Sequence, residues 1–172
     1  MKDFKQYIRD IPDFPKPGII FKDITPLLAN GEAFRAVVDR IATTYRGGVD
    51  QVLGIESRGF IIGAPVAYAL GTGLAVVRKP GKLPSRTFAA RYALEYGNDT
   101  LEIYRDAFGQ PCRVLIVDDL LATGGTAHAA VELVSRLGGQ VVACAFVIEL
   151  ATLKGRDRLF PHPVASLIQY PD

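Results

Sequence analysis

Residues 114–126 read VLIVDDLLATGGT. The apolar run Val114–Val117 is typical of a strand that is buried on both faces. Two consecutive carboxylates, Asp118 and Asp119, stand at the predicted carboxyl end of this strand, and a helix is predicted after the small residues that follow. Open α/β sheets bind their ligands at the carboxyl ends of parallel strands. The stretch therefore predicts the fold class and the place of the site together.

The small residues 123–126 indicate what is bound there. Because this TGGT segment lacks bulk, successive backbone N–H groups can converge on an anion, and the start of a helix adds partial positive charge. Carboxylates repel a phosphate, so Asp118 and Asp119 suit the hydroxyls of a sugar that carries it. An acidic pair after a strand also occurs in phosphoacceptor and magnesium sites, but the TGGT segment favours a sugar phosphate.

The pattern of apolar residues in the rest of the chain is that of an α/β protein. From Val49 onward, short apolar runs alternate with longer periodic ones, which is typical of a central, mostly parallel sheet flanked by helices. A length of 172 residues suits one domain, residues 1–172, with a single core. The predicted strands are residues 51–55, 73–77, 113–117 and 140–149, and the predicted helices are residues 60–70 and 126–137.

Two segments lack this alternation of strand-like and helix-like patterns. Residues 11–25 contain Pro12, Pro15 and Pro17, which make the backbone stiff and irregular, and we interpret them as a cap over the site. Residues 78–100 form a long excursion without helical periodicity. Loops of this length in a compact domain are usually functional lids or disordered segments, so we expect a lid loop there.

The composition excludes several classes of protein. The chain has 20 basic and 18 acidic residues, a net charge of +2, which is far from the basic excess of a typical nucleic-acid binder. Neither a signal peptide nor an apolar run of about 18 residues is present, so we expect no membrane association and a cytoplasmic location. Cys112 and Cys144 lie beside apolar runs without metal-ligand spacing, which predicts buried free thiols.

Residues 118–126 resemble the signature with which type I phosphoribosyltransferases bind phosphoribosyl pyrophosphate (PRPP), and in particular that of the adenine branch of the family. Five separated motifs that agree are far more specific than any one of them alone. The resemblance implies the family's α/β fold, with residues 11–25 as its hood and residues 78–100 as its catalytic lid. The four further motifs that fit in order are residues 11–23 (IPDFPKPGIIFKD), 56–59 (ESRG), 78–84 (RKPGKLP) and 94–97 (LEYG).

The resemblance also implies a role for each candidate residue toward PRPP. A surface position is the commonest fate of an arginine, but the place of Arg58 just after a buried strand and before Gly59 argues otherwise, whereas residues 79–82 would by default be a solvated loop. The family implies a cis peptide bond at Glu56–Ser57. It further implies that the 5′-phosphate is held by Ala122, Thr123, Gly124, Gly125 and Thr126, the ribose hydroxyls by Asp118 and Asp119, and the pyrophosphate by Ser57, Arg58, Arg78, Lys79 and Lys82.

The resemblance of residues 11–25 to the family's hood also implies how the base is held. Phe21 would stack on the base while the backbone of Ile20 and Lys22 reads its edge, and Leu120 would close the other face. Glu95 would be the lid carboxylate near the purine N7, where it could take a proton or stabilise the protonated ring. With Arg58 it makes up the expected catalytic pair. Without the resemblance, Phe21 would be read as a core aromatic and Glu95 as a solvated side chain.

Ala122 bears on the choice of base. Relatives that act on 6-oxopurines generally carry aspartate at this position and orotate enzymes carry threonine, whereas a methyl group can replace neither. A hood that reads the base through backbone groups suits adenine, whose amino group donates and whose N1 accepts. The resemblance therefore implies transfer of the 5-phosphoribosyl group to adenine, giving AMP and pyrophosphate. It also implies Mg²⁺ carried mainly by PRPP, with few protein ligands, and a homodimer.

Two other classes of function stay open. A regulator that keeps the PRPP fold and binds nucleic acid would need a basic face or an added module, and the few residues before Ile11 cannot form one. A receiver-like phosphoacceptor domain would use an aspartate as its acceptor. Neither His128 nor His162 is assigned a role.

Overall fold

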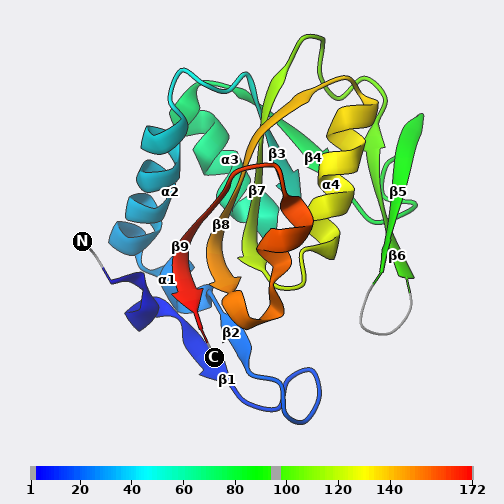
Figure 1. Ribbon diagram of the computed structural model, residues 1–172. Coiled ribbons are helices and arrows are strands. Elements are labelled where there is room, and N and C mark those ends of the chain that lie inside the picture. The colour runs from blue at the N-terminus through cyan, green and yellow to red at the C-terminus, as the bar shows by residue number, and fades with distance from the viewer. Residues whose placement is uncertain (1–2, 94–97, 172) are drawn as a thin grey trace.

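The fold is built on a parallel sheet with helices on both faces. The computed structural model describes residues 3–93 and 98–171. Within that part of the chain, five parallel strands lie in the order β4-β3-β7-β8-β9 (Figure 1). The strands are β3 (Gln51–Ile55), β4 (Gly73–Val77), β7 (Arg113–Leu121), β8 (Gln140–Leu150) and β9 (Val164–Tyr170). The helices are α1 (Thr25–Ala29), α2 (Gly31–Tyr45), α3 (Arg58–Leu70) and α4 (Gly125–Arg136).

The side chains of β7 point alternately into the two hydrophobic cores, one on each face of the sheet. Val114 and Ile116 pack with the residues of α4, whereas Leu115 and Val117 pack with those of α2 and α3, and all four are fully buried. Successive side chains of a strand point to opposite faces, so a sheet covered on both faces requires a continuous apolar run. The predicted α/β class with a central parallel sheet is confirmed.

The predicted elements differ from the structure mainly at their ends. The strands expected at residues 51–55 and 73–77 have those bounds, and α3 and α4 begin two residues and one residue before the predicted helices. The strand expected at residues 113–117 continues to Leu121, because Asp118, Leu120 and Leu121 pair with β8. The two aspartates consequently lie within β7 rather than after it.

Helices α1 and α2 and strand β9 lie outside the predicted elements. The sequence does carry a signal for α2. The side-chain oxygen of Asn30 accepts a hydrogen bond from Ala33 N at 2.9 Å, and Val37, Val38 and Ile41 are buried on one face of the helix. An N-cap residue followed by apolar residues at helical spacing is the usual mark of such a helix.

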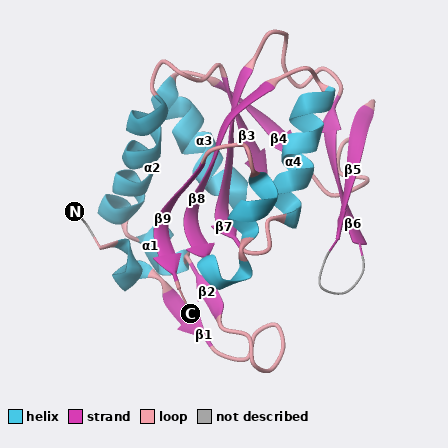
Figure 2. Cartoon of the chain, viewed as in Figure 1, coloured by secondary structure: helices cyan, strands magenta, loops and turns pink. Residues whose placement is uncertain are grey.

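Residues 11–25, expected to be irregular, are framed by a short antiparallel ribbon. Strand β1 (Arg9–Ile11) pairs with β2 (Phe21–Asp23). The chain between them turns at Asp13, whose φ is 57° and whose carboxylate accepts a hydrogen bond from Gly18 N at 2.8 Å. In Figure 2 the ribbon lies at the edge of the sheet to which the arrowheads of β7, β8 and β9 point.

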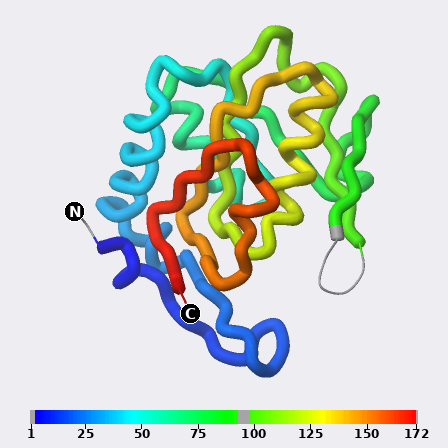
Figure 3. The backbone as a smooth tube through the Cα atoms, viewed as in Figure 1, coloured from blue at the N-terminus to red at the C-terminus, as the bar shows by residue number. Residues whose placement is uncertain are grey.

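The ribbon is fastened to the end of the chain. Figure 3 shows the C-terminal end of β9 beside the N-terminal segment. The ring of Tyr170 lies 3.9 Å from Lys22 Nζ and 5.2 Å from Lys5 Nζ, the latter within the 3₁₀ helix η1 (Phe4–Tyr7). Cation–π contacts of this kind tie β2 and η1 to the last strand of the sheet.

Residues 78–100 are not an irregular loop throughout, so that part of the prediction is wrong. Strand β5 (Thr87–Ala93) pairs with β6 (Asn98–Tyr104), and this hairpin packs beside α4 (Figure 1). Ala90, Leu101 and Ile103 are buried in the core that the hairpin shares with α4. Apolar residues with a period of two explain the strands, and a search for helical periodicity misses them. The role of a lid stays a prediction.

Both cysteines are free and buried, as predicted. Burial raises the pKa of the Cys144 thiol to about 12, so this thiol stays protonated at neutral pH. Across residues 3–93 and 98–171, no helix combines the length and apolar character that crossing a bilayer demands.

The largest fully buried side chain provides a test of the core. Phe146 on β8 is 1% exposed, whereas Phe160 is 84% exposed. Phe146→Ala should lower the free energy of unfolding by about 3–5 kcal/mol, because it leaves a cavity between β8 and α4. Phe160→Ala is the matched control and should change it by less than about 0.5 kcal/mol. Urea unfolding of both variants would measure this, and equal losses would contradict the assigned core.

Candidate active site

A cavity of about 380 Å³ lies at the carboxyl ends of β3 and β7, where residues 114–126 predict a site. Three parts of the chain line it. They are residues 56–58 after β3, residues 118–127 from the end of β7 into the first turn of α4, and the pair Lys79 and Tyr92. The predicted loop, the acidic pair and the ESRG motif therefore share one cavity.

The loop between β7 and α4 is suited to an anion. Gly124 has a φ of 80°, a left-handed conformation that favours glycine, and α4 begins at the next residue. The first N–H groups of a helix have no acceptor within the helix, and the residues that carry them here, Gly125 to Ala127, line the cavity. Negative charge is stabilised at such a helix start.

The pair Asp118 and Asp119 forms an acidic wall beside this loop. Asp118 Oδ1 accepts a hydrogen bond from Asp119 N at 2.8 Å, and Asp119 Oδ2 lies 2.8 Å from Arg58 Nε. Within the described chain, Asp119 Oδ2 is buried and makes no hydrogen bond of good geometry, so the ion pair is its main support. Such an oxygen suits a hydroxyl donor from a ligand.

Burial sets the charge of this pair. Loss of hydration, together with the neighbouring charge of Asp119, raises the pKa of Asp118 well above its usual value. Burial also raises the pKa of Asp119, although the Arg58 guanidinium opposes that change. The two carboxyl groups therefore hold a proton more readily than two aspartates in water.

The approach of α3 to β7 requires glycine at position 59. A Cβ atom on Gly59 would lie 2.9 Å from both Asp118 Oδ1 and Val117 O, closer than a real Cβ approaches an oxygen. The missing side chain lets the first turn of α3 start against the acidic pair. This start brings the preceding residue, Arg58, within reach of Asp119.

Residues 56–58 turn between β3 and α3 with the cis peptide bond that the family implies at Glu56–Ser57. Glu56 Oε1 accepts a hydrogen bond from Arg78 Nη2 at 3.1 Å, and its Oε2 accepts one from Lys79 N at 2.5 Å. Burial alone would raise the pKa of Glu56, but these hydrogen bonds lower it below its usual value. The ionised Glu56 thus joins the turn to the chain after β4.

The cations predicted to neutralise pyrophosphate do not all reach the cavity. Arg58 and Lys79 line it, whereas Arg78 and Lys82 are not among its lining residues. The Arg78 guanidinium is held by Glu56, and Lys82 is exposed.

Lys79 is held by two residues that the sequence analysis did not identify. Lys79 Nζ donates a hydrogen bond to Tyr92 Oη at 2.8 Å and forms an ion pair with Asp99. Tyr92 lies on β5 and Asp99 on β6, so the hairpin sets the position of a cation in the cavity. The strand pairing that brings them together is the feature missed in the sequence.

The hood residues meet the site through Arg58. The guanidinium carbon of Arg58 lies 5.1 Å from the centre of the Phe21 ring, and the Phe14 ring packs edge-on against Phe21 at 5.2 Å. Ile20, Phe21 and Lys22 are not among the lining residues, although Leu120 is. Glu95 lies outside the described residues.

Comparison with known proteins agrees with this geometry. Residues 25–164 match the family model described as the phosphoribosyl transferase domain. The chain is 58% identical over 170 residues to the adenine phosphoribosyltransferase of Chloroflexus aurantiacus, with 98% of each chain covered. The chain belongs to the adenine phosphoribosyltransferase family. The enzyme of that name from Syntrophotalea carbinolica is 57% identical, with 99% of this chain and 100% of the relative covered.

Solved structures of adenine phosphoribosyltransferases have the same fold. The crystal structure from Thermoanaerobacter pseudethanolicus superimposes with a TM-score of 0.94 at 50% identity, covering 97% of this chain and 98% of the other. The Saccharomyces cerevisiae structure, complexed with an imino-altritol bisphosphate and adenine, gives 0.90 at 41% identity, covering 95% and 96%. Similarity to family enzymes along the whole chain favours a transferase over a regulator or a phosphoacceptor domain.

The acidic pair should lower stability at neutral pH. Because folding raises the pKa of Asp118 above the ordinary aspartate value of 3.8, its contribution to stability is present below pH 3.8 and is lost as the pH rises through the folded-state pKa. Asp118→Asn should therefore raise the free energy of unfolding at pH 7 by about 1 kcal/mol. Thermal unfolding between pH 4 and pH 8 would measure this. A gain that fails to shrink toward pH 4 would contradict the assigned cause.

Proposed function

We propose that this chain transfers the 5-phosphoribosyl group of PRPP to adenine and releases AMP and pyrophosphate, as a pentosyltransferase of purine salvage. The observation that carries the proposal is the one cavity shared by the loop Ala122–Thr126 and the pair Asp118–Asp119. A site for a phosphate beside a site for hydroxyls matches the two ends of a ribose 5-phosphate. Membership of the adenine phosphoribosyltransferase family supports the rest of the reaction.

In this proposal, the binding of PRPP exchanges the partners of Arg58 and Asp119. Their ion pair of 2.8 Å joins a cation suited to pyrophosphate to a carboxylate suited to ribose hydroxyls. A substrate that brings both groups offers hydroxyl donors to Asp119 and an anion to Arg58. Neither charge is then left buried without a partner, and an unpaired buried charge would be costly.

The pyrophosphate is assigned to residues at two sides of the cavity. Ser57 and Arg58 come from the turn after β3, and Lys79 comes from the chain after β4. Arg78 and Lys82 are proposed to act near the outer end of the pyrophosphate, since they lie close to Lys79 in the chain without lining the cavity.

Adenine is assigned to the space between the β1–β2 ribbon and Leu120. Phe21 would stack on the base, and the backbone of Ile20 and Lys22 would meet its edge. The Lys22 side chain favours a backbone role for that residue, because its ammonium is already paired with Asp10 at 2.8 Å and lies over the Tyr170 ring. Ala122 would present only a methyl group and its peptide to the ligand.

Departure of pyrophosphate leaves positive charge on the ribose ring, as in the cleavage of a glycosidic bond. The acidic pair would hold the ring in place through its hydroxyls, while Arg58 and Lys79 stabilise the leaving group. Glu95 would act on the purine N7 as the second catalytic residue besides Arg58. A lid that excludes water would prevent hydrolysis of PRPP.

The proposal includes Mg²⁺ carried mainly by PRPP, which neutralises charge on the leaving pyrophosphate when it is bound. Asp118 and Asp119 line the cavity with carboxylate oxygens, the donors that a hard cation of this kind prefers. In the described part of the chain, no group of three or more His, Cys, Asp and Glu side chains could hold a metal ion by itself. Asp118 and Asp119 would hold the hydroxyls of the sugar.

We also propose a cytoplasmic homodimer. The family resemblance supports the dimer, and two buried free thiols suit a reducing compartment. Analytical ultracentrifugation at the concentration of the assay would test the assembly.

Selectivity for the base tests the assignment to adenine. With PRPP and Mg²⁺, kcat/KM for adenine should exceed that for hypoxanthine or guanine by roughly 100-fold or more, because a 6-oxo base reverses the donor and acceptor pattern that backbone groups would read. The measurement is the formation of AMP and pyrophosphate with the bases in competition. Comparable values for a 6-oxopurine would overturn the assignment.

Two variants separate the proposed catalytic and binding roles. Glu95→Gln should lower kcat by about 100-fold or more with little change in the KM for PRPP, as expected for loss of a general acid or base. Asp119→Asn should raise the KM for PRPP by roughly tenfold or more, because a charged acceptor for a sugar hydroxyl is lost. Steady-state kinetics on both variants would show this. The reverse pattern would remove Glu95 from its role.

A further inference from the structure

The loop proposed to hold the 5′-phosphate rests against a distant part of the chain. Gly155, at the start of the 3₁₀ helix η3 (Gly155–Leu159), is buried against it. A Cβ on Gly155 would overlap the carbonyl oxygen of Ala122 and would lie 2.9 Å from Gly124 N. A Cβ on Gly124 would in turn overlap the carbonyl oxygen of Gly155. The two backbones are therefore in direct contact, with no room for a side chain on either.

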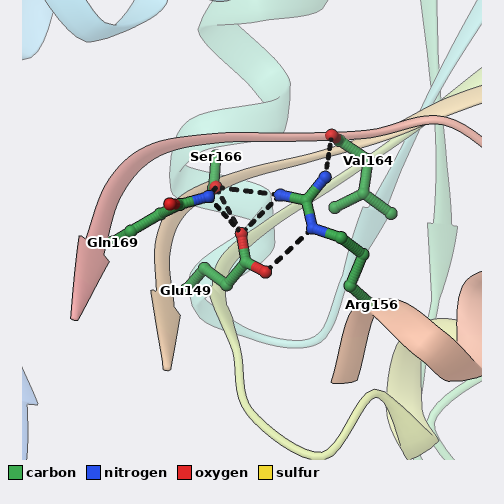
Figure 4. A network of polar contacts seen from close by, with 5 residues as sticks. All are labelled: Glu149, Arg156, Val164, Ser166 and Gln169. Atoms are coloured by element: carbon green, nitrogen blue, oxygen red, sulfur yellow. Dashed lines mark hydrogen bonds and ion pairs between the residues drawn. The ribbon is translucent and has the colours of Figure 1, made fainter. Parts of the chain in front are cut away.

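The residue after Gly155 anchors this contact to the sheet. Figure 4 shows the Arg156 guanidinium beside the Glu149 carboxylate. Arg156 Nε donates to Glu149 Oε1 at 3.0 Å, and Arg156 Nη2 donates to Glu149 Oε2 at 2.6 Å. The third nitrogen, Nη1, donates to Val164 O at 2.7 Å. One guanidinium thus joins η3 to the end of β8 and to the start of β9.

Both oxygens of the Glu149 carboxylate accept hydrogen bonds. Glu149 is 4% exposed, and its Oε2 also accepts hydrogen bonds from Ser166 Oγ and from Gln169 Nε2, the latter at 3.1 Å (Figure 4). The Arg156 hydrogen bonds lower the pKa of Glu149, so it stays ionised at neutral pH. Bidentate pairs of this kind have a fixed geometry as well as a favourable energy.

Gly155 lies at the junction of two short 3₁₀ helices. It follows Lys154, whose φ of 52° is unusual for a residue with a side chain, and the short helix η2 (Ala151–Leu153) precedes it. Leu159 is buried at the other end of η3 and packs in the core with α4. Arg156 follows Gly155 directly in the chain, so its hydrogen bonds to Glu149 and Val164 act next to the contact with the loop.

We propose that Glu149 and Arg156 are positioning residues for the phosphate loop. Their ion pair holds Gly155 against Ala122 and Gly124, and this contact fixes the direction of the loop's N–H groups. Neither side chain lines the cavity, so they act through the loop and not on the ligand. The proposal rests on the assignment of this loop to the 5′-phosphate.

The test compares Arg156→Gln with Arg113→Gln. Arg113 makes the same kind of bidentate pair, with Asp50, at the opposite end of β7, so it is a matched control. Arg156→Gln should raise the Kd of ribose 5-phosphate by roughly tenfold to 100-fold, since a displaced loop misdirects its donors. The KM for adenine at saturating PRPP should change by less than about twofold. Arg113→Gln should leave both values within about twofold of the wild type.

Titration calorimetry with ribose 5-phosphate measures the binding, and it does so whether or not the wild-type chain forms AMP. Failure of the proposed reaction would appear as absent turnover in the wild type, separately from the effect of Arg156→Gln on binding. If Arg156→Gln leaves the Kd unchanged, or weakens ribose 5-phosphate and adenine equally, the positioning role is wrong.

A second pair of variants keeps the proposal testable if Arg156→Gln does not fold. Gly155→Ala places a methyl group directly against Ala122 O, and Ser166→Ala removes one hydrogen bond from Glu149. Gly155→Ala should weaken the binding of ribose 5-phosphate at least as much as Arg156→Gln, and Ser166→Ala should weaken it less than Arg156→Gln.

Arg156→Lys should bind ribose 5-phosphate more tightly than Arg156→Gln but less tightly than the wild type, because lysine keeps the charge but not the bidentate geometry. Wild-type affinity in Gly155→Ala would overturn the contact on which the proposal depends.

Discussion

Two adjacent carboxylates at the end of β7, Asp119 buried and Asp118 half-buried, are the constraint around which the site is arranged. Removing charged groups from water is unfavourable unless they are paired and hydrogen-bonded. Asp118 has the N–H of Asp119, and Asp119 has Arg58 at 2.8 Å. Arg58 reaches that position because Gly59 lets α3 start against β7. The ring of Phe21 on β2 lies beside the same guanidinium, which links the β1–β2 ribbon to the acidic pair.

The energetic disadvantage of this pair in the free protein is an advantage for binding. Acceptors already held in a poorly hydrated wall need little rearrangement when a sugar arrives, which is how binding sites gain from preorganisation. Before a ligand binds, the positive charge of Arg58 balances the negative charge of Asp119. In the proposed reaction, PRPP brings both an anion and hydroxyl groups, so each member of the pair would find a new partner in it.

Other parts of the site are held from further away. Asp99 and Tyr92 on the hairpin hold Lys79, and Glu149 with Arg156 holds the contact between Gly155 and the phosphate loop. These supports come from chain segments outside residues 118–126. They explain why a short motif needs most of the domain to position it.

The sequence by itself determined the class of fold and the centre of the site. A continuous apolar run before Asp118 is typical of a strand covered on both faces, and the TGGT segment after it suits the close approach of an anion. Both signals are local, so they can be read without the fold. The bounds of β3 and β4 and the buried thiols follow from similar local patterns.

Only the tertiary structure decided which distant residues complete that centre. The extension of β7 to Leu121 depends on pairing with β8, and the hairpin of β5 and β6 turns an expected loop into two strands. Gly155 carries no mark in the sequence of its contact with Gly124. Such contacts arise between segments far apart in the chain, and their geometry is set by the packing of the whole sheet rather than by any neighbouring residue.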